Sequence, residues 1–145
     1  MKKIFLINFF RFVGGAYGKS NERDMMIELM NNGPIAVSFE PGNSFMYYED
    51  GVYHEVRPSW MDKGEEQPEW TRVEHSVLLY GWGETEGGVK YWNLLNSWGE
   101  RWGEGGSFRM KRGNDEMGIE SMGEAADPII LRNGVVVEPP TSTGN

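Results

Sequence analysis

Two strand-like runs joined by a glycine-rich turn constrain the fold of this chain more than any other feature. The runs cover residues 75–82 and 89–96, and the turn between them reads GETEGG. If the residues that flank the turn pair with each other, His75 lies directly opposite Asn96 on the neighbouring strand. Opposite residues point to the same face with Cβ atoms about 5 Å apart, and a slip of one residue would separate them.

A histidine that faces an asparagine has a specific chemical use. The neutral amide oxygen of Asn96 can accept the imidazole N–H of His75, which fixes the ring and leaves its other nitrogen to exchange a proton. The alternative is a structural hairpin in which the two polar side chains only satisfy each other. The spacing alone leaves both interpretations open.

Three segments around this pair carry tryptophan, glycine and proline at fixed offsets. They are NGPIAV at 32–37, VEHSVLLYGWG at 73–83 and NSWGERWGEGGSFRM at 96–110. In this order they resemble the G-P-[VM]-x-V, N-H-A-V-L-x-V-G-Y-G and N-S-W-G-x-x-W-G-E-x-G-Y-F-R-I segments of papain-like cysteine peptidases. The resemblance extends over residues 12–128.

Further segments resemble the cathepsin C, or dipeptidyl peptidase I, group of that family. FVGGAYG at 12–18 is similar to Y-V-G-G-F-Y-G, and RGNDEMGIES at 112–121 is similar to R-G-T-D-E-C-A-I-E-S. DPII at 127–130 is similar to the C-terminal end of that group. The resemblance implies a peptide or protein substrate and the release of dipeptides from its N-terminus.

The resemblance also implies catalytic roles for two residues and supporting roles at the active site for two tryptophans. His75 would be the general base and acid, and Asn96 would orient it, as in the Cys-His-Asn triad. Trp98 would lie over the contact between these two side chains and keep water away from it. Trp102 would line the leaving-group side of the cleft. For both tryptophans, packing in the core is the alternative, and it is compatible with these roles.

Ser76 and Ile119 would lie near the pocket for the second substrate residue, again by resemblance. In the family mechanism a cysteine thiolate attacks the peptide carbonyl, the histidine protonates the leaving amine, and water then cleaves the acyl-enzyme. The chain contains no cysteine. We therefore expect it to be inactive alone and to need a cysteine-bearing half or chain as a partner.

Three departures from the family pattern accompany the missing cysteine. The upstream Q-G-x-C-G-x-C-[WY] segment has no counterpart, and Ser20 does not stand at the position of the nucleophile. Glu74 replaces the asparagine that commonly precedes the histidine. Phe12 replaces a tyrosine that helps bind chloride in cathepsin C-like enzymes. We expect no cofactor, and the lost hydroxyl argues against the chloride ion that the resemblance suggests.

Composition argues against several other classes of function. The net charge of -8 offers no basic stripe for nucleic acid. No apolar run approaches the roughly 20 residues that cross a bilayer, so we expect no membrane partner. The two histidines, His54 and His75, lie in separate segments without thiolates, which argues against a metal site. His54 is expected to lie in a surface loop.

Two nucleotide-binding look-alikes fail on their spacing. Residues 18–20 read GKS, as at the end of a phosphate-binding loop, but Val13 stands where the first glycine belongs. Residues 81–83 read GWG, as at the start of a dinucleotide fingerprint, but Glu86 stands at the third glycine.

The expected fold is α+β, the strand-rich half of the papain-like fold, with a barrel-like antiparallel sheet and one packed helix. The helix has cap candidates at residues 20–21, an apolar stripe of Met25, Met26, Leu29 and Met30, and a stop at NGP. A strand should follow at 35–39, and residues 54–72 should form a long surface loop.

Three regions follow from this organisation. Residues 1–11 are an N-terminal strand or an expression-derived segment, 12–131 are the histidine- and asparagine-bearing peptidase portion, and 132–145 are a flexible tail. Because the expected half would expose apolar surface, the chain should self-associate. By resemblance, it belongs in a lysosomal or secretory compartment.

Three hypotheses therefore stand for the chain as a whole. It is a portion of a cathepsin C-like peptidase, a non-catalytic homologue that binds peptides or regulates an active enzyme, or an interaction module. The joint presence of His75, Asn96 and Trp98 favours the first, because a module free of catalysis has no physical need for an oriented imidazole beneath a tryptophan.

Overall fold

A computed structural model describes residues 6–55, 73–132 and 135–137 of the chain. The predicted loop at 54–72 lies almost wholly outside the described residues. The elements in chain order are β1 Leu6–Phe12, α1 Glu22–Asn32, β2 Ile35–Phe39, η1 Phe45–Tyr47, β3 Val52–Tyr53, β4 His75–Glu84, β5 Lys90–Leu95, β6 Ser107–Lys111, η3 Glu116–Gly118, β7 Gly123–Arg132 and β8 Val135–Val137.

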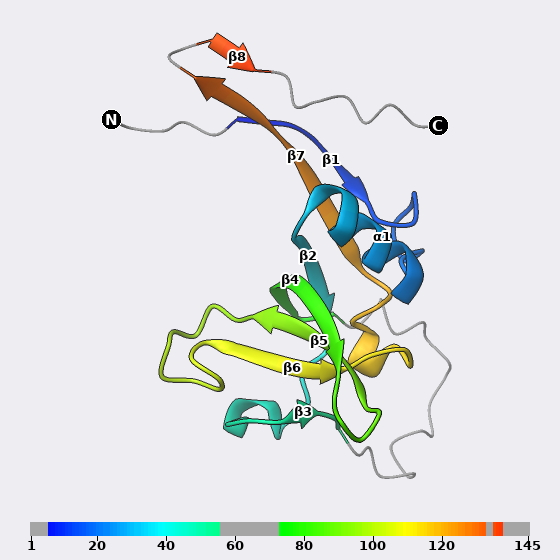
Figure 1. The fold of residues 1–145 in the computed structure, drawn as a ribbon, viewed down its shortest axis with the longest axis vertical. Helices are drawn as coiled ribbons and strands as arrows, with labels where there is room; N and C mark the ends of the chain where they lie inside the picture. The colour runs from blue at the N-terminus through cyan, green and yellow to red at the C-terminus, as the bar shows by residue number, and fades with distance from the viewer. Residues whose placement is uncertain (1–5, 56–72, 133–134, 138–145) are drawn as a thin grey trace.

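Seven strands form one hydrogen-bonded path in the order β1-β7-β2-β4-β5-β6-β3, and β8 pairs with β7. Figure 1 shows β4, β5, β6 and β3 side by side at one end of the sheet, while the long β7 runs away from them beside β1. The expected strand-rich, barrel-like sheet is present and differs from the expectation in two details. β3 runs parallel to β6, and the path does not close, because β1 and β3 occupy its two ends.

Helix α1 confirms the predicted stop and one of the two cap candidates, Asn21. The side chain of Asn21 accepts the backbone N–H of Asp24 at 3.0 Å, and Gly33 ends the helix with φ 98°. Met25 is fully buried, whereas Met30 is 76% exposed, so its inclusion in the apolar stripe is wrong. The two side chains lie about 140° apart around the helix axis, because each residue turns by about 100°.

The pairing between β4 and β5 differs from the predicted register. Trp82 pairs with Trp92, and β4 continues to Glu84, which pairs with Lys90. The turn between the strands is therefore shorter than the glycine-rich stretch suggests. The prediction that His75 lies directly opposite Asn96 is wrong.

A one-residue bulge at Tyr80 returns the two predicted site residues to the same face. On the His75 side of the bulge Leu78 pairs with Leu95, so Asn96 continues the strand diagonally across from His75. Beyond the bulge the register is shifted by one residue. That shifted register, carried to the end of the strands, would put the two on opposite faces, because side chains alternate along a strand.

The core fills the inner face of the central strands. Alternate residues of β2 and β4 are buried, as the predicted strand at 35–39 requires. The largest fully buried side chains come from β2, β5, β6, η1 and α1 and are Trp92, Phe39, Phe45, Phe108 and Met25. The core is therefore rich in aromatic rings at the end of the sheet where β4 begins.

The two ends of the chain add strands to β7. β1 lies in the segment predicted as a strand or an expression-derived stretch, and it pairs with β7. β8 pairs its three valines with residues 130–132 of β7, within the region predicted as a flexible tail. None of the helices among the described residues is long and apolar enough to cross a membrane.

Candidate active site

The imidazole of His75 contacts the amide of Asn96 at one end of the sheet. His75 is the first residue of β4, and Asn96 follows the last residue of β5. Nε2 of His75 lies 2.9 Å from Oδ1 of Asn96. The asparagine is 8% exposed, and its backbone N–H donates to the carbonyl of Gly106 at 2.9 Å, so its position is held by the backbone.

The backbone of Ser97 decides which atom of the Asn96 amide faces the histidine. The N–H of Ser97 donates to the same Oδ1 at 2.8 Å. Because a backbone N–H only donates, the atom at this corner is the oxygen, and Nε2 of His75 must donate to it. The neutral ring therefore carries its proton on Nε2, and Nδ1 keeps the lone pair that can take up another proton.

Aromatic rings surround the imidazole of His75. Its ring centroid lies 5.1 Å from that of Trp98, 5.7 Å from Phe39 and 6.3 Å from Phe45. Trp98 is 44% exposed, so it covers the imidazole from the solvent side, whereas both phenylalanines are fully buried. The histidine is thus held between an outer indole and an inner aromatic wall.

Trp102 lies beside Trp98 rather than against the histidine. The two indole centroids are 5.1 Å apart, and Trp102 packs on Phe45 at 5.0 Å. Its indole N–H donates to the carbonyl of Met46 at 3.2 Å, which ties this loop to η1. Trp102 therefore supports the tryptophan that covers the site.

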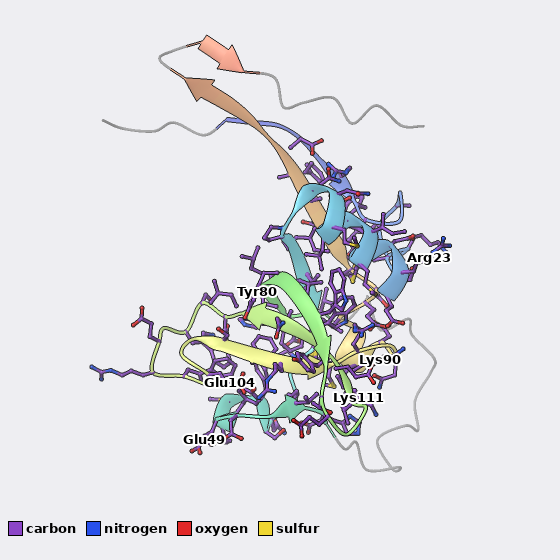
Figure 2. The ribbon with its side chains drawn as sticks, viewed as in Figure 1. Arg23, Glu49, Tyr80, Lys90, Glu104 and Lys111 are labelled. Atoms are coloured by element: carbon purple, nitrogen blue, oxygen red, sulfur yellow. The ribbon has the colours of Figure 1, made fainter. Side chains whose placement is uncertain are left out.

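A carboxylate anchors the loop that carries both tryptophans. Glu104 accepts the backbone N–H of Gly51 at 3.1 Å and pairs with Arg109 on β6. Figure 2 labels Glu104 between β6 and the β3 segment. The hydrogen bond from Arg109 holds the pKa of this carboxyl below its ordinary value. At Gly103, a Cβ would lie 2.6 Å from the carbonyl oxygen of Ser107, so the turn requires glycine.

The two residues expected near a substrate pocket differ in their access to solvent. Ser76 is exposed, and its hydroxyl lies 2.8 Å from that of Ser38 on β2. It points to the face of β4 opposite to His75, since the two are adjacent on one strand. Ile119 is fully buried. Of the pair, only Ser76 is open to a ligand in this conformation.

The position predicted to weaken chloride binding carries an aromatic contact. The ring of Phe12 packs edge-on against Tyr17 with centroids 5.5 Å apart. A phenyl ring has no N–H or O–H to donate to an anion, so this position does not fit chloride. A chloride site stays a prediction from resemblance.

His54 lies outside this cluster. Its Nδ1 is 2.8 Å from Oε2 of Glu116, which is 5% exposed and also accepts the backbone N–H of Glu55. The described residues hold no group of three or more metal-ligating side chains that could bind a metal ion. His54 therefore lies at the surface, where it hydrogen-bonds the buried carboxylate of Glu116.

The sequence did not point to Phe39, Phe45 or the backbone of Ser97 as parts of this site. Phe39 was predicted only as the last residue of a strand, and the β2–β4 pairing that places it opposite His75 joins segments far apart in sequence. A signal existed in the alternation of residues 35–39, which puts Phe39 on the buried face.

Comparisons with known proteins identify the family of the chain. The chain matches the papain family cysteine protease profile over residues 11–126. It is 42% identical over 122 residues to cathepsin C of Schistosoma mansoni, covering 83% of this chain and 26% of that protein. It is 40% identical over 138 residues to dipeptidyl aminopeptidase 1 of Plasmodium falciparum, covering 85% of this chain and 20% of that protein.

A solved structure supports the fold. Bromelain protease from Ananas comosus, determined with the E64 inhibitor, superposes with a TM-score of 0.65 at 30% identity. The match covers 83% of this chain and 50% of the bromelain chain. The expected strand-rich half of the papain-like fold is confirmed, and the chain spans about a quarter of the cathepsin C that it matches. This chain belongs to the papain family of cysteine proteases.

Proposed function

We propose that this chain supplies the histidine and asparagine of a cysteine-peptidase site whose thiol comes from outside its 145 residues. The observation that carries the proposal is the 2.9 Å contact between Nε2 of His75 and Oδ1 of Asn96. Because Nε2 donates in this contact, Nδ1 is the atom that would take the proton from a cysteine thiol. The resulting thiolate would attack the peptide carbonyl.

The same residue then serves the second half of the reaction. The protonated His75 would donate its Nδ1 proton to the leaving amine and, as a base, would next activate the water that cleaves the acyl-enzyme. Asn96 would keep the ring in one orientation during both transfers. Trp98 would exclude water from the contact, and Trp102 would line the leaving-group side.

An exposed apolar face supports a partner half. Leu78 and Leu95 form a cross-strand pair and are 38% and 44% exposed, and Tyr80 beside them is 47% exposed. Figure 2 labels Tyr80 on the β4–β5 layer. Contiguous exposed apolar side chains commonly mark an interface. We propose that the cysteine-bearing half covers this face.

The substrate proposal is more specific and rests on the similarity to cathepsin C and dipeptidyl aminopeptidase 1. The substrate would be a peptide with a free N-terminus, from which dipeptides are released. Ser76 would lie near the pocket for the second residue, and Ile119 would shape that region from within the core. A lysosomal or secretory compartment is the proposed location.

Reconstitution tests this function. The chain is mixed with a cysteine-bearing half of a papain family enzyme, the complex is isolated, and hydrolysis of a fluorogenic dipeptidyl amide is measured. The same substrate with a blocked N-terminus is the matched control for dipeptide release. We expect activity only in the complex and only on the unblocked substrate, and we expect His75→Ala to abolish it.

The alternative is a non-catalytic homologue that binds peptides or regulates an active enzyme. An isolated complex with native-like spectra and no hydrolysis of either substrate would support that alternative. Hydrolysis of the blocked substrate alone would retain the peptidase and reject dipeptide release.

A further inference from the structure

The hydrogen bond to Asn96 fixes one atom of the His75 imidazole and leaves the tilt of the ring to its packing neighbours. Among the described residues, the rings that pack on it are those of Trp98, Phe39 and Phe45. Trp98 is 44% exposed and belongs to the surface. The buried side of the imidazole is therefore bounded by the two phenylalanines.

Strand pairing fixes the position of Phe39 relative to His75. Phe39 pairs directly with His75 in the β2–β4 ladder, and its carbonyl accepts the backbone N–H of Glu74 at 3.2 Å. Its ring meets the imidazole at 73° with centroids 5.7 Å apart, a T-shaped contact. The two rings therefore extend from facing positions of adjacent strands and touch on the buried side.

Phe45 holds Phe39 in place. The two rings are 5.2 Å apart at 85°, and both side chains are fully buried. Phe45 comes from η1, a 3-10 helix, so this aromatic wall joins strand β2 to an element outside the sheet. A dense aromatic contact of this kind restricts the rotamers of every ring in it.

We propose that Phe39, supported by Phe45, is a positioning residue that holds the His75 imidazole so that Nε2 stays directed at Asn96. The histidine half of the site is then preformed in this chain before any thiol is supplied. The proposal deepens the proposed function, since ring orientation matters for catalysis only if His75 is the base. The orientation itself is a property of the isolated chain.

The test uses nuclear magnetic resonance on the full chain with ¹⁵N-labelled histidine. The chain has only two histidines, so His54, bound to Glu116, serves as an internal reference. Phe39→Leu is compared with Phe108→Leu. Phe108 is equally buried and touches Phe39 and Phe45 with centroids at 6.1 and 4.9 Å, so its loss controls for a loosened core.

We expect the neutral His75 of the parent chain to be protonated at Nε2. In Phe39→Leu, exchange of the Nε2 proton with water should rise about two- to tenfold, the range that follows from losing one aromatic pair. The Nδ1-protonated tautomer should also become detectable. Phe108→Leu should leave both signals of His75 unchanged, and His54 should not respond in either variant.

Equal responses of His75 in both variants, or no response in either, would overturn the proposal. If Phe39→Leu does not fold, Phe39→Met replaces it, since methionine fills similar volume without a ring. A positive result in the isolated chain together with an inactive reconstituted complex would retain this inference and reject the proposed function. An active complex in which His75 does not respond to Phe39→Leu would reject this inference and retain the proposed function.

Discussion

Nε2 of His75 and Oδ1 of Asn96 lie 2.9 Å apart, although no ladder pair joins the two residues. The side chains meet diagonally across β4 and β5, because the bulge at Tyr80 shifts the register by one residue and returns both to one face. Ser97 then fixes the amide so that its oxygen faces the ring. A local irregularity of the sheet therefore assembles the candidate site.

Replacing Asn96 by alanine should weaken both stability and the reconstituted activity. The change leaves the Nε2–H of His75 and the N–H of Ser97 without their acceptor in a buried corner. We expect a loss of about 1–3 kcal/mol in the free energy of unfolding. In the reconstituted complex kcat/KM should fall by about tenfold or more, since an unoriented base loses part of its usual contribution.

Asn93→Ala is the matched control for this change, because Asn93 lies in β5, three residues before Asn96, and is only half-buried. Urea unfolding and steady-state kinetics measure the two variants side by side. An Asn96→Ala complex as active as the Asn93→Ala complex would remove Asn96 from the mechanism.

Alanine substitutions of the two tryptophans should affect activity and stability to different degrees. Trp98→Ala removes an exposed ring, so the stability loss should be small, about 1 kcal/mol, while kcat/KM falls as water reaches the His75 contact. Trp102→Ala removes a ring that packs on Phe45 and a hydrogen bond to the carbonyl of Met46. Its stability loss should be larger, about 2–4 kcal/mol. Thermal unfolding paired with kinetics distinguishes the two, and the reverse ranking would contradict these roles.

The Glu104–Arg109 pair should make stability depend on pH. The folded state holds the pKa of Glu104 below its ordinary value of 4.5, so this stabilisation is present above that pKa and is lost as pH falls through the lowered one. Glu104→Gln keeps an acceptor for Gly51. It should destabilise the chain by about 1 kcal/mol at neutral pH, since the pair is partly screened by solvent, and by less at pH 3, which lies below the ordinary pKa.

Urea unfolding at the two pH values tests this prediction, with Glu100→Gln as the control at an exposed site in the same loop. A loss for Glu104→Gln that stays constant between neutral pH and pH 3 would show that charge does not contribute.

The exposed face around Leu78 and Leu95 should drive self-association of the isolated chain. Leu78→Ser removes half of the apolar cross-strand pair, and sedimentation velocity should show a shift toward monomer. Val89→Ser is the control, because Val89 is similarly exposed, at 42%, but lies in the turn. A parent chain that is fully monomeric at high concentration would contradict this use of the face and weaken the case for a partner half.

Local patterns in the sequence predict much of the framework. The ends of α1 follow from the side chain of Asn21 and the backbone freedom of Gly33. Both act within one turn of the helix. The strand at 35–39 follows from alternation. Met30 was wrongly placed in the apolar stripe, because its position around the helix lies outside the arc that faces the sheet.

The sequence by itself determined the family, the candidate pair and the absence of a thiol, because these depend on residue identities and their offsets. The register of β4 against β5, the bulge at Tyr80 and the wall of Phe39 and Phe45 were decided only in the tertiary structure. The physical reason is that strand pairing and ring packing bury the core as a whole. They therefore depend on contacts between segments that are far apart in the chain. Turn residues alone therefore could not set the distance between His75 and Asn96.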